Sequence, residues 1–213
     1  MNQGFLITGT DTGVGKTFVT SLMAMVLTDA GINTGVMKPV ETGCAVKNGR
    51  LIPIDAMTLK NASGAEDPLD AINPFRFAPA LAPNIAARLE NVKIDLRKIK
   101  DCFKSLSKAH DLILVEGAGG LLSPLTDEKT MADLAVALKL SIIIVAPSRI
   151  GVINHALLTV ECARRRNLHI DGIILNNPTP PERDASRAFN RAEIERLSGI
   201  PVLGEIPFLK PLQ

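Results

Sequence analysis

The chain has 213 residues, of which 46% are hydrophobic and 22% charged, and its formal net charge is +2. This composition favours a well-buried globular chain over disorder, and the length is short for two domains. With so small a net charge, no Trp, no Tyr and only seven Phe, the chain offers little that binds nucleic acid, so we expect no such partner.

The three cysteines, Cys44, Cys102 and Cys162, are widely spaced and form no Cys-x-x-Cys pair. They therefore indicate neither a zinc site nor a disulfide framework. No apolar run approaches the roughly 18 residues of a membrane span, and an apolar strand begins by residue 5. We therefore expect no membrane segment, no signal peptide and a cytoplasmic location.

The first motif follows the first predicted strand, residues 4–8. Residues Gly9 to Thr17 read Gly-Thr-Asp-Thr-Gly-Val-Gly-Lys-Thr, and a helical pattern continues to about Ala30. A strand, a glycine-rich turn and a helix in this order are typical of the phosphate-binding loop of P-loop proteins, because backbone N–H groups and the helix dipole bind the anion. Lys16 can reach the β- and γ-phosphates, and the Thr17 hydroxyl can bind Mg²⁺.

This loop departs from the strict Gly-x4-Gly-Lys-Thr pattern at one position. The first glycine of that pattern would fall at position 10, where this chain has Thr10, and Gly9 comes one residue early. The loop is therefore a variant P-loop. We still predict a nucleoside triphosphate site, because a strand and a helix flank the turn.

Strands and helical patterns alternate along most of the chain. Several predicted strands are uninterrupted apolar runs, such as residues 112–115 and 142–145, which suit a parallel sheet covered on both faces. Right-handed crossovers then give a P-loop NTPase-like α/β fold, with a doubly wound, mainly parallel sheet and helices on both faces, in a single domain over residues 1–213. The predicted strands are 4–8, 34–38, 111–116, 141–146, 170–175 and one near 202, and the predicted helices are 17–30, 95–108, 131–140, 152–166 and 184–197.

The segment from about residue 43 to residue 91 differs from the rest of the chain. It contains five prolines, and its periodicity is weak. We interpret it as a long irregular excursion with two short helices, one near residues 55–61 and one that Pro83 opens at its first position. Loops of this length in compact domains are often functional.

Polar or glycine-rich sequence follows each predicted strand, at the sheet edge where open α/β folds bind ligands. Lys38 ends the second strand just before a proline, which places a second cation near the phosphates. Glu116 ends an apolar strand where a P-loop protein needs a carboxylate for Mg²⁺, and the glycines after it let backbone approach a ligand. Asp55 precedes a helical pattern, and its position fits an N-cap as well as a metal ligand.

Together these segments resemble the dethiobiotin synthetase family over nearly the whole chain, in order and at matching spacing. The most specific elements are Lys-Pro-Val-Glu-Thr-Gly at residues 38–43 and Val-Glu-Gly-Ala-Gly-Gly at residues 115–120, to which residues 9–17, 151–155 and 204–208 add. The resemblance implies an ATP-dependent cyclo-ligase that forms C–N bonds in biotin biosynthesis. In that reaction 7,8-diaminononanoate and CO₂ or bicarbonate, with ATP and Mg²⁺, give dethiobiotin, ADP and phosphate through a carbamic–phosphoric anhydride.

The resemblance also implies roles for particular residues. The helix start at residues 151–154 corresponds to the place where the other subunit holds the substrate's carboxylate tail, which implies a homodimer. Gly13 stands where many members of the family carry an acidic residue. The implied sites are Lys38 and Lys16 for catalysis; Thr12, Gly13, Val14, Gly15, Lys16, Thr17, Asp55, Glu116, Gly117, Gly119, Asn176, Gly204, Glu205, Ile206 and Pro207 for ATP, with the last five around adenine; Thr42, Gly151 and Asn154 for the substrate; and Thr17, Asp55 and Glu116 for the metal.

Two other P-loop functions are alternatives. An amide-forming enzyme of the same superfamily, such as a cobyrinate amidase, would need a glutaminase domain, for which 213 residues leave no room. The second alternative is a partitioning-type ATPase switch that acts through protein partners. That group places a signature lysine one residue after the first position of the loop, where this chain has Asp11, and this difference disfavours a switch.

Overall fold

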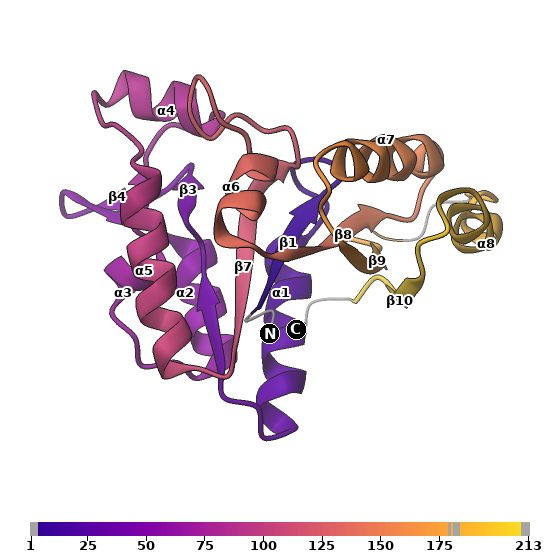
Figure 1. Cartoon of the computed structure of the whole chain (residues 1–213), viewed down its shortest axis with the longest axis horizontal. Helices are drawn as coiled ribbons and strands as arrows, with labels where there is room; N and C mark the ends of the chain where they lie inside the picture. The colour runs from indigo at the N-terminus through magenta and orange to yellow at the C-terminus, as the bar shows by residue number, and fades with distance from the viewer. Residues whose placement is uncertain (1–3, 179, 181–183, 210–213) are drawn as a thin grey trace.

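The computed structural model describes residues 4–178, 180 and 184–209, so the ends of the predicted 1–213 domain lie outside the described residues. Six strands form a parallel sheet: β1 (Gly4–Gly9), β2 (Thr34–Met37), β7 (Leu112–Gly120), β8 (Ser141–Pro147), β9 (Ile170–Asn176) and β10 (Val202–Ile206). Their order across the sheet is β10-β9-β8-β1-β7-β2, with β2 at one edge (Figure 1). The predicted α/β fold with a parallel sheet is confirmed.

Helices cover both faces of this sheet, because apolar side chains of the strands alternate between the two sides. In β8, Ile142 and Ile144 belong to one hydrophobic core and Ile143 belongs to another on the opposite face. The predicted doubly wound arrangement is therefore present. The first core includes residues of α5 (Leu96–Ala109), α6 (Met131–Leu138), α7 (Val152–Arg165) and α8 (Arg187–Ser198), and the opposite face is packed by α1 (Lys16–Asp29) and α2 (Ile54–Ser63).

Strand β7 extends further than the sequence predicted. It continues past Glu116 to Gly120, which pairs with Gly9 after an irregularity in the register. The glycine-rich segment after Glu116 is thus held against the start of the P-loop instead of forming a free loop.

The segment from residue 43 to residue 91 is more regular than predicted. It includes an unpredicted hairpin between β4 (Ala45–Lys47) and β5 (Arg50–Ile52), whose turn residues Asn48 and Gly49 have φ of 51° and 71°. Asn-Gly favours this two-residue turn, so the signal was present in the sequence. The two predicted short helices are α2 and α4 (Pro83–Leu89), and the segment also contains α3 (Leu69–Ile72) and β6 (Phe75–Phe77), which pairs in parallel with β3 (Val40–Thr42).

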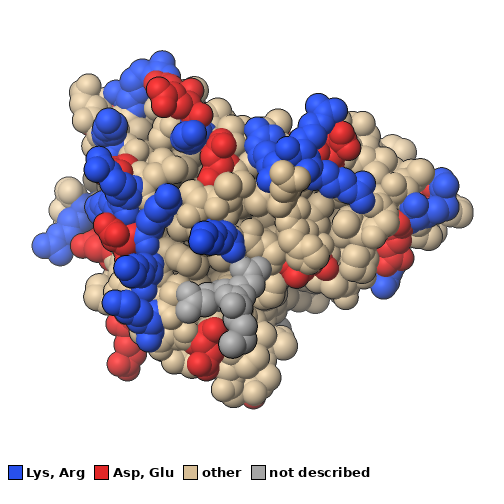
Figure 2. Space-filling model, in the orientation of Figure 1, with Lys and Arg blue, Asp and Glu red and all other residues tan. Residues whose placement is uncertain are grey.

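A row of basic side chains lies along one side of the molecule. Figure 2 shows Lys and Arg along the side that α5 occupies in Figure 1. The exposed basic residues of α5 are Arg97, Lys98, Lys100, Lys104 and Lys108. Within the described ranges, no helix is both long and apolar enough to cross a membrane.

Candidate active site

The P-loop runs from β1 into α1, and two of its glycines have left-handed backbone conformations. Gly13 has φ of 74° and Gly15 has φ of 91°. Gly15 is also confined by space, since a Cβ atom there would lie 2.1 Å from Nδ2 of Asn176. Asn176, at the end of β9, donates from this nitrogen to the carbonyl of Val14 at 2.9 Å. The end of β9, two strands away from β1 in the sheet, therefore supports the loop.

Lys16 lies within the P-loop, where its Nζ donates to the carbonyl of Asp11 at 3.0 Å. Burial of the amine, followed by the like charge of Lys38, lowers its pKa to about 8, although the carboxylates of Glu116 and Asp55 act in the opposite direction. The carboxylates of the protein therefore do not fully stabilise the charged form of Lys16, and an anionic ligand that binds there would stabilise it further.

Lys38, Glu116, Asp55 and Thr17 converge beside this loop. Oε1 of Glu116 accepts a hydrogen bond from Nζ of Lys38 and another, at 2.9 Å, from Oγ1 of Thr17. Nζ of Lys38 also pairs with Oδ2 of Asp55 at 3.1 Å. Lys38 and Glu116 are only 4% and 1% exposed, so Lys38 is not a solvated surface lysine.

The environment of Lys38 raises the pKa of this residue, whereas the environment of Lys16 lowers its pKa. Burial alone lowers the pKa of Lys38, but the charges and hydrogen bonds of Glu116 and Asp55 outweigh burial and raise that pKa to about 12. Lys38 is therefore a permanent cation at the edge of the phosphate site. Its Nζ also lies 3.4 Å from the carbonyl of Gly117.

The oxygen atoms of this cluster fit Mg²⁺. Oε2 of Glu116 is buried and has no hydrogen-bond partner among the described residues, while the Thr17 hydroxyl and the Asp55 carboxylate lie close by. Mg²⁺ prefers oxygen ligands and commonly takes one or two carboxylates together with substrate phosphates. In the part of the chain that the structure describes, no group of three or more His, Cys, Asp or Glu could hold a metal, so phosphate oxygens would have to complete this site.

Asp55 is held in place by Glu41, a residue that the sequence did not single out. The N-cap of α2 is Pro53, so Asp55 is not the N-cap but lies inside the first turn. Glu41 is 5% exposed, and its two carboxylate oxygens accept from the backbone N–H groups of Asp55 at 2.9 Å and Ala56 at 3.0 Å. Burial raises the pKa of Glu41, and these two hydrogen bonds oppose that rise.

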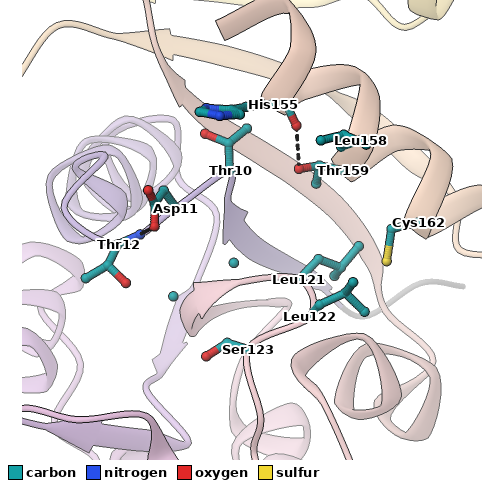
Figure 3. A pocket seen from close by; sticks show the side chains of 12 residues that line it. Thr10, Asp11, Thr12, Leu121, Leu122, Ser123, His155, Leu158, Thr159 and Cys162 are labelled. Atoms are coloured by element: carbon teal, nitrogen blue, oxygen red, sulfur yellow. Dashed lines mark hydrogen bonds between the residues drawn. The ribbon is translucent and has the colours of Figure 1, made fainter. Parts of the chain in front are cut away.

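A cavity of about 370 Å³ adjoins the start of the P-loop (Figure 3). Its walls include apolar side chains of Leu121 and Leu158 and hydroxyl groups of Thr10 and Thr159. Oγ1 of Thr10 is buried without a hydrogen-bond partner in the described part of the chain. Of the predicted site residues, Thr12 and Gly119 line this cavity, and the rest of its lining comes from the P-loop, the end of β7, the turn after β7, and α7.

The remaining predicted residues lie further apart. Thr42 is half-buried at the end of β3, and Gly151 is the N-cap of α7, with φ of 89°, three residues before the exposed Asn154. Asn176 and Pro207 line a second cavity of about 210 Å³ beside the P-loop. Gly204, Glu205 and Ile206 belong to β10, and the last two accept hydrogen bonds from the side chain of Asn177.

A parallel α/β sheet whose first strand leads into a loop carrying Lys16 and Thr17, with Glu116 facing that threonine, defines a P-loop nucleotide-binding protein. The chain matches the AAA domain family over residues 3–213. It is 38% identical to the ATP-dependent dethiobiotin synthetase BioD of Thermodesulfovibrio yellowstonii, over 100% of this chain and 91% of the relative. It is 44% identical to the same enzyme of Anaeromyxobacter dehalogenans, over 97% of this chain and 90% of the relative. The chain belongs to the ATP-dependent dethiobiotin synthetase family.

The fold is shared more widely than the family. A ParA family ATPase from Chlorobium tepidum superimposes with a TM-score of 0.59 at 18% identity, covering 99% of this chain and 86% of that one. At so low an identity the likeness concerns the fold alone, and it gives no additional support to the alternative of a partitioning-type switch.

We expect Glu41→Ala to lower the free energy of unfolding by about 1–3 kcal/mol, because two N–H groups in the first turn of α2 lose a buried acceptor. Urea unfolding followed by circular dichroism measures this loss. Glu66→Ala, which truncates an exposed glutamate near the other end of α2, is the control and should change stability by less than about 0.5 kcal/mol. Equal stability of both variants would contradict a capping role for Glu41.

We expect ATP binding to take up a proton at alkaline pH, because the phosphates favour the charged form of Lys16, whose pKa in the free protein is about 8. Uptake should approach one proton per site near pH 9 and fall towards zero near pH 6.5. Calorimetric titrations in two buffers with different ionisation enthalpies measure this number. Lys16→Arg, which stays charged, is the matched control and should abolish the uptake, and wild-type binding without uptake at pH 9 would refute the assignment.

Proposed function

We propose that the protein joins 7,8-diaminononanoate and CO₂ at the expense of ATP and forms the cyclic urea of dethiobiotin. The observation that carries this proposal is the convergence of the buried Lys38 amine with Glu116 and Thr17 at the P-loop of a chain that belongs to this family. We also propose a cytoplasmic location, where ATP is available.

The proposed reaction has three steps, each with balanced atoms. One amine of the substrate adds to CO₂, and the nitrogen loses a proton, which leaves a carbamate. A carbamate oxygen then attacks the γ-phosphorus of ATP, the bond from that phosphorus to the bridging oxygen breaks, and ADP departs. The second amine attacks the carbonyl carbon of the resulting anhydride, expels inorganic phosphate, loses a proton and closes the ring.

The charges at the site suit the second step. Carbamate and triphosphate are both anionic, so their approach requires concentrated positive charge. Lys38 is cationic before any ligand arrives, and Lys16 gains its charge more readily once phosphate is near. Thr17, Asp55 and Glu116 would hold Mg²⁺, which when bound neutralises charge on the phosphates. No protein nucleophile is needed for this sequence of steps.

The surroundings of the P-loop suggest where the other groups bind. We assign the aliphatic chain of the diamine to the cavity of Figure 3, since Leu121, Leu122 and Leu158 give it apolar surface beside the polar groups of Thr10 and Thr12. Thr42 would contact the reacting end, and the helix start at Gly151 and Asn154 of a second subunit would hold the carboxylate tail, so we propose a homodimer. Asn176 and Pro207 would flank the adenine of ATP.

We expect phosphate release from ATP to require both 7,8-diaminononanoate and bicarbonate, with one ADP formed for each dethiobiotin. A coupled phosphate assay and mass spectrometry of the product measure the two quantities, with reactions lacking one substrate as controls. Turnover that is indifferent to both substrates would exclude the ligase and favour the switch.

We expect Lys38→Ala to lower kcat by at least about 10²-fold, because it removes positive charge that stabilises the transferring phosphoryl group. Lys47→Ala, an exposed lysine in the β4–β5 hairpin, is the matched control and should retain full activity. Thermal melts should accompany the assay, because Lys38→Ala also leaves two carboxylates without their cation. A folded Lys38→Ala protein with near-normal kcat would show that Lys38 does not act in the reaction.

A further inference from the structure

The backbone of Lys38 makes no hydrogen bonds to the strands of the central sheet in the described part of the chain. Among the described strands, β2 is at the edge of the sheet and pairs with β7 alone, and its last paired residue is Met37, opposite Val115. Lys38 follows directly, so its N–H and C=O need partners outside the sheet. These partners come from a segment about 35 residues further along the chain.

Two consecutive residues at the end of α3 provide those partners. The N–H of Lys38 donates to the carbonyl of Ile72 at 2.8 Å, and the carbonyl of Lys38 accepts from Nδ2 of Asn73 at 2.6 Å. The same Nδ2 atom donates to the carbonyl of Phe75 at 3.1 Å. Asn73 is completely buried, so water does not compete for these bonds. Residues 72 and 73 thus take the place of a further strand beside Lys38.

The backbone N–H and C=O of Asn73 are both hydrogen-bonded. Its N–H donates to the carbonyl of Leu69 at 2.7 Å, and its own carbonyl accepts from Arg76 at 2.9 Å. Pro74 follows and restricts its backbone further. The donor on its side chain is therefore presented to Lys38 from a rigid support.

The side-chain amide of Asn73 is only half satisfied. Its Oδ1 is buried and has no hydrogen-bond partner among the described residues. Burial of an unpaired carbonyl costs stability, and an apolar side chain of similar size would avoid this cost. An apolar side chain could not, however, donate to Lys38. The amide nitrogen thus holds the carbonyls of Lys38 and Phe75, while the amide oxygen adds no hydrogen bond.

We propose that Asn73 is a positioning residue for Lys38, and this inference rests on the proposed catalytic role of that lysine. Lys38 has a long side chain, and its Nζ must remain between Glu116 and Asp55 while reaching the phosphate site. Fixing the carbonyl at the base of the side chain limits the positions that Nζ can take. A cation that is already in place costs no reorganisation when charge develops on the phosphoryl group.

The P-loop does not contact Asn73 through any hydrogen bond of the described residues, so ATP binding should be insensitive to it. Loss of the amide should therefore lower kcat and leave the KM for ATP nearly unchanged. We expect Asn73→Ala to reduce kcat by about tenfold or more, with the KM for ATP within about twofold of wild type. Asn73→Leu should behave alike, and it fills the same space if the alanine variant folds poorly.

Ile72→Ala is the matched control. It truncates a completely buried side chain in the adjacent residue but leaves the carbonyl that accepts from the N–H of Lys38. It should lower the melting temperature and leave kcat close to that of wild type at a temperature where every variant is folded. A purely structural role for Asn73 would make the two variants alike.

A double-mutant cycle with Lys38→Ala tests whether Asn73 acts through the lysine. In the Lys38→Ala background, Asn73→Ala should cause no further loss of the residual turnover. Losses that multiply in the double variant, or a kcat of Asn73→Ala and Asn73→Leu within twofold of wild type, would overturn the proposal.

Amide hydrogen exchange separates this inference from the proposed function. Exchange at the amides of residues 37, 38, 40 and 41 should be faster in Asn73→Ala and Asn73→Leu than in wild type and Ile72→Ala, whatever reaction the protein catalyses. If wild type forms no dethiobiotin but this pattern appears, the proposed reaction is wrong and the positioning of the Lys38 backbone by Asn73 is supported. Unchanged exchange in both Asn73 variants would overturn the positioning role even in an active ligase.

Discussion

The buried contact between Lys38 and Glu116 is the interaction on which the rest of the site depends. Lys38 directly follows β2, and Glu116 lies within the neighbouring strand β7. Neither charge would be tolerated there alone, because removing one partner of a buried pair leaves the other uncompensated. Thr17 shares the same glutamate oxygen and Asp55 shares the same amine, so the P-loop, both strands and α2 meet in one arrangement of charge.

The two lysines of the site differ in how the protein compensates their positive charge. Lys38 has its counter-charges within the protein, and its pKa is raised to about 12. Lys16 is buried near another cation, and its pKa is lowered to about 8. The first lysine therefore supplies a fixed field before any substrate binds. The second is charged most favourably when phosphate is present, which couples the electrostatics of the site to nucleotide binding.

The P-loop and the charge cluster are supported by buried polar side chains that bond to the backbone. Asn176 holds the carbonyl of Val14 behind the P-loop, Glu41 holds the first turn of α2 that carries Asp55, and Asn73 holds the carbonyl of Lys38. Each support is a buried polar side chain bonded to backbone, so it fixes the loop, helix turn or strand end that carries a residue of the site. The long segment between β2 and α5 thus contributes to function by supplying Asp55 and by holding both Asp55 and Lys38 in the charge cluster.

Local sequence and the general geometry of parallel sheets were enough to determine the fold and to predict that Lys16, Lys38 and Glu116 lie at one edge of the sheet. Apolar runs predicted β7 and β8, and the rule that ligands lie beyond the carboxyl ends of strands linked Lys16, Lys38 and Glu116 before any contact was known. The tertiary structure alone decided that Asp55 is not an N-cap, that Glu41 and Asn73 provide support, and that the pKa values of the two lysines move in opposite directions. These properties depend on burial and on hydrogen bonds between residues that are far apart in the sequence, by 14 positions for Glu41 and Asp55 and by 35 positions for Lys38 and Asn73. No periodicity or motif in the chain indicates such bonds.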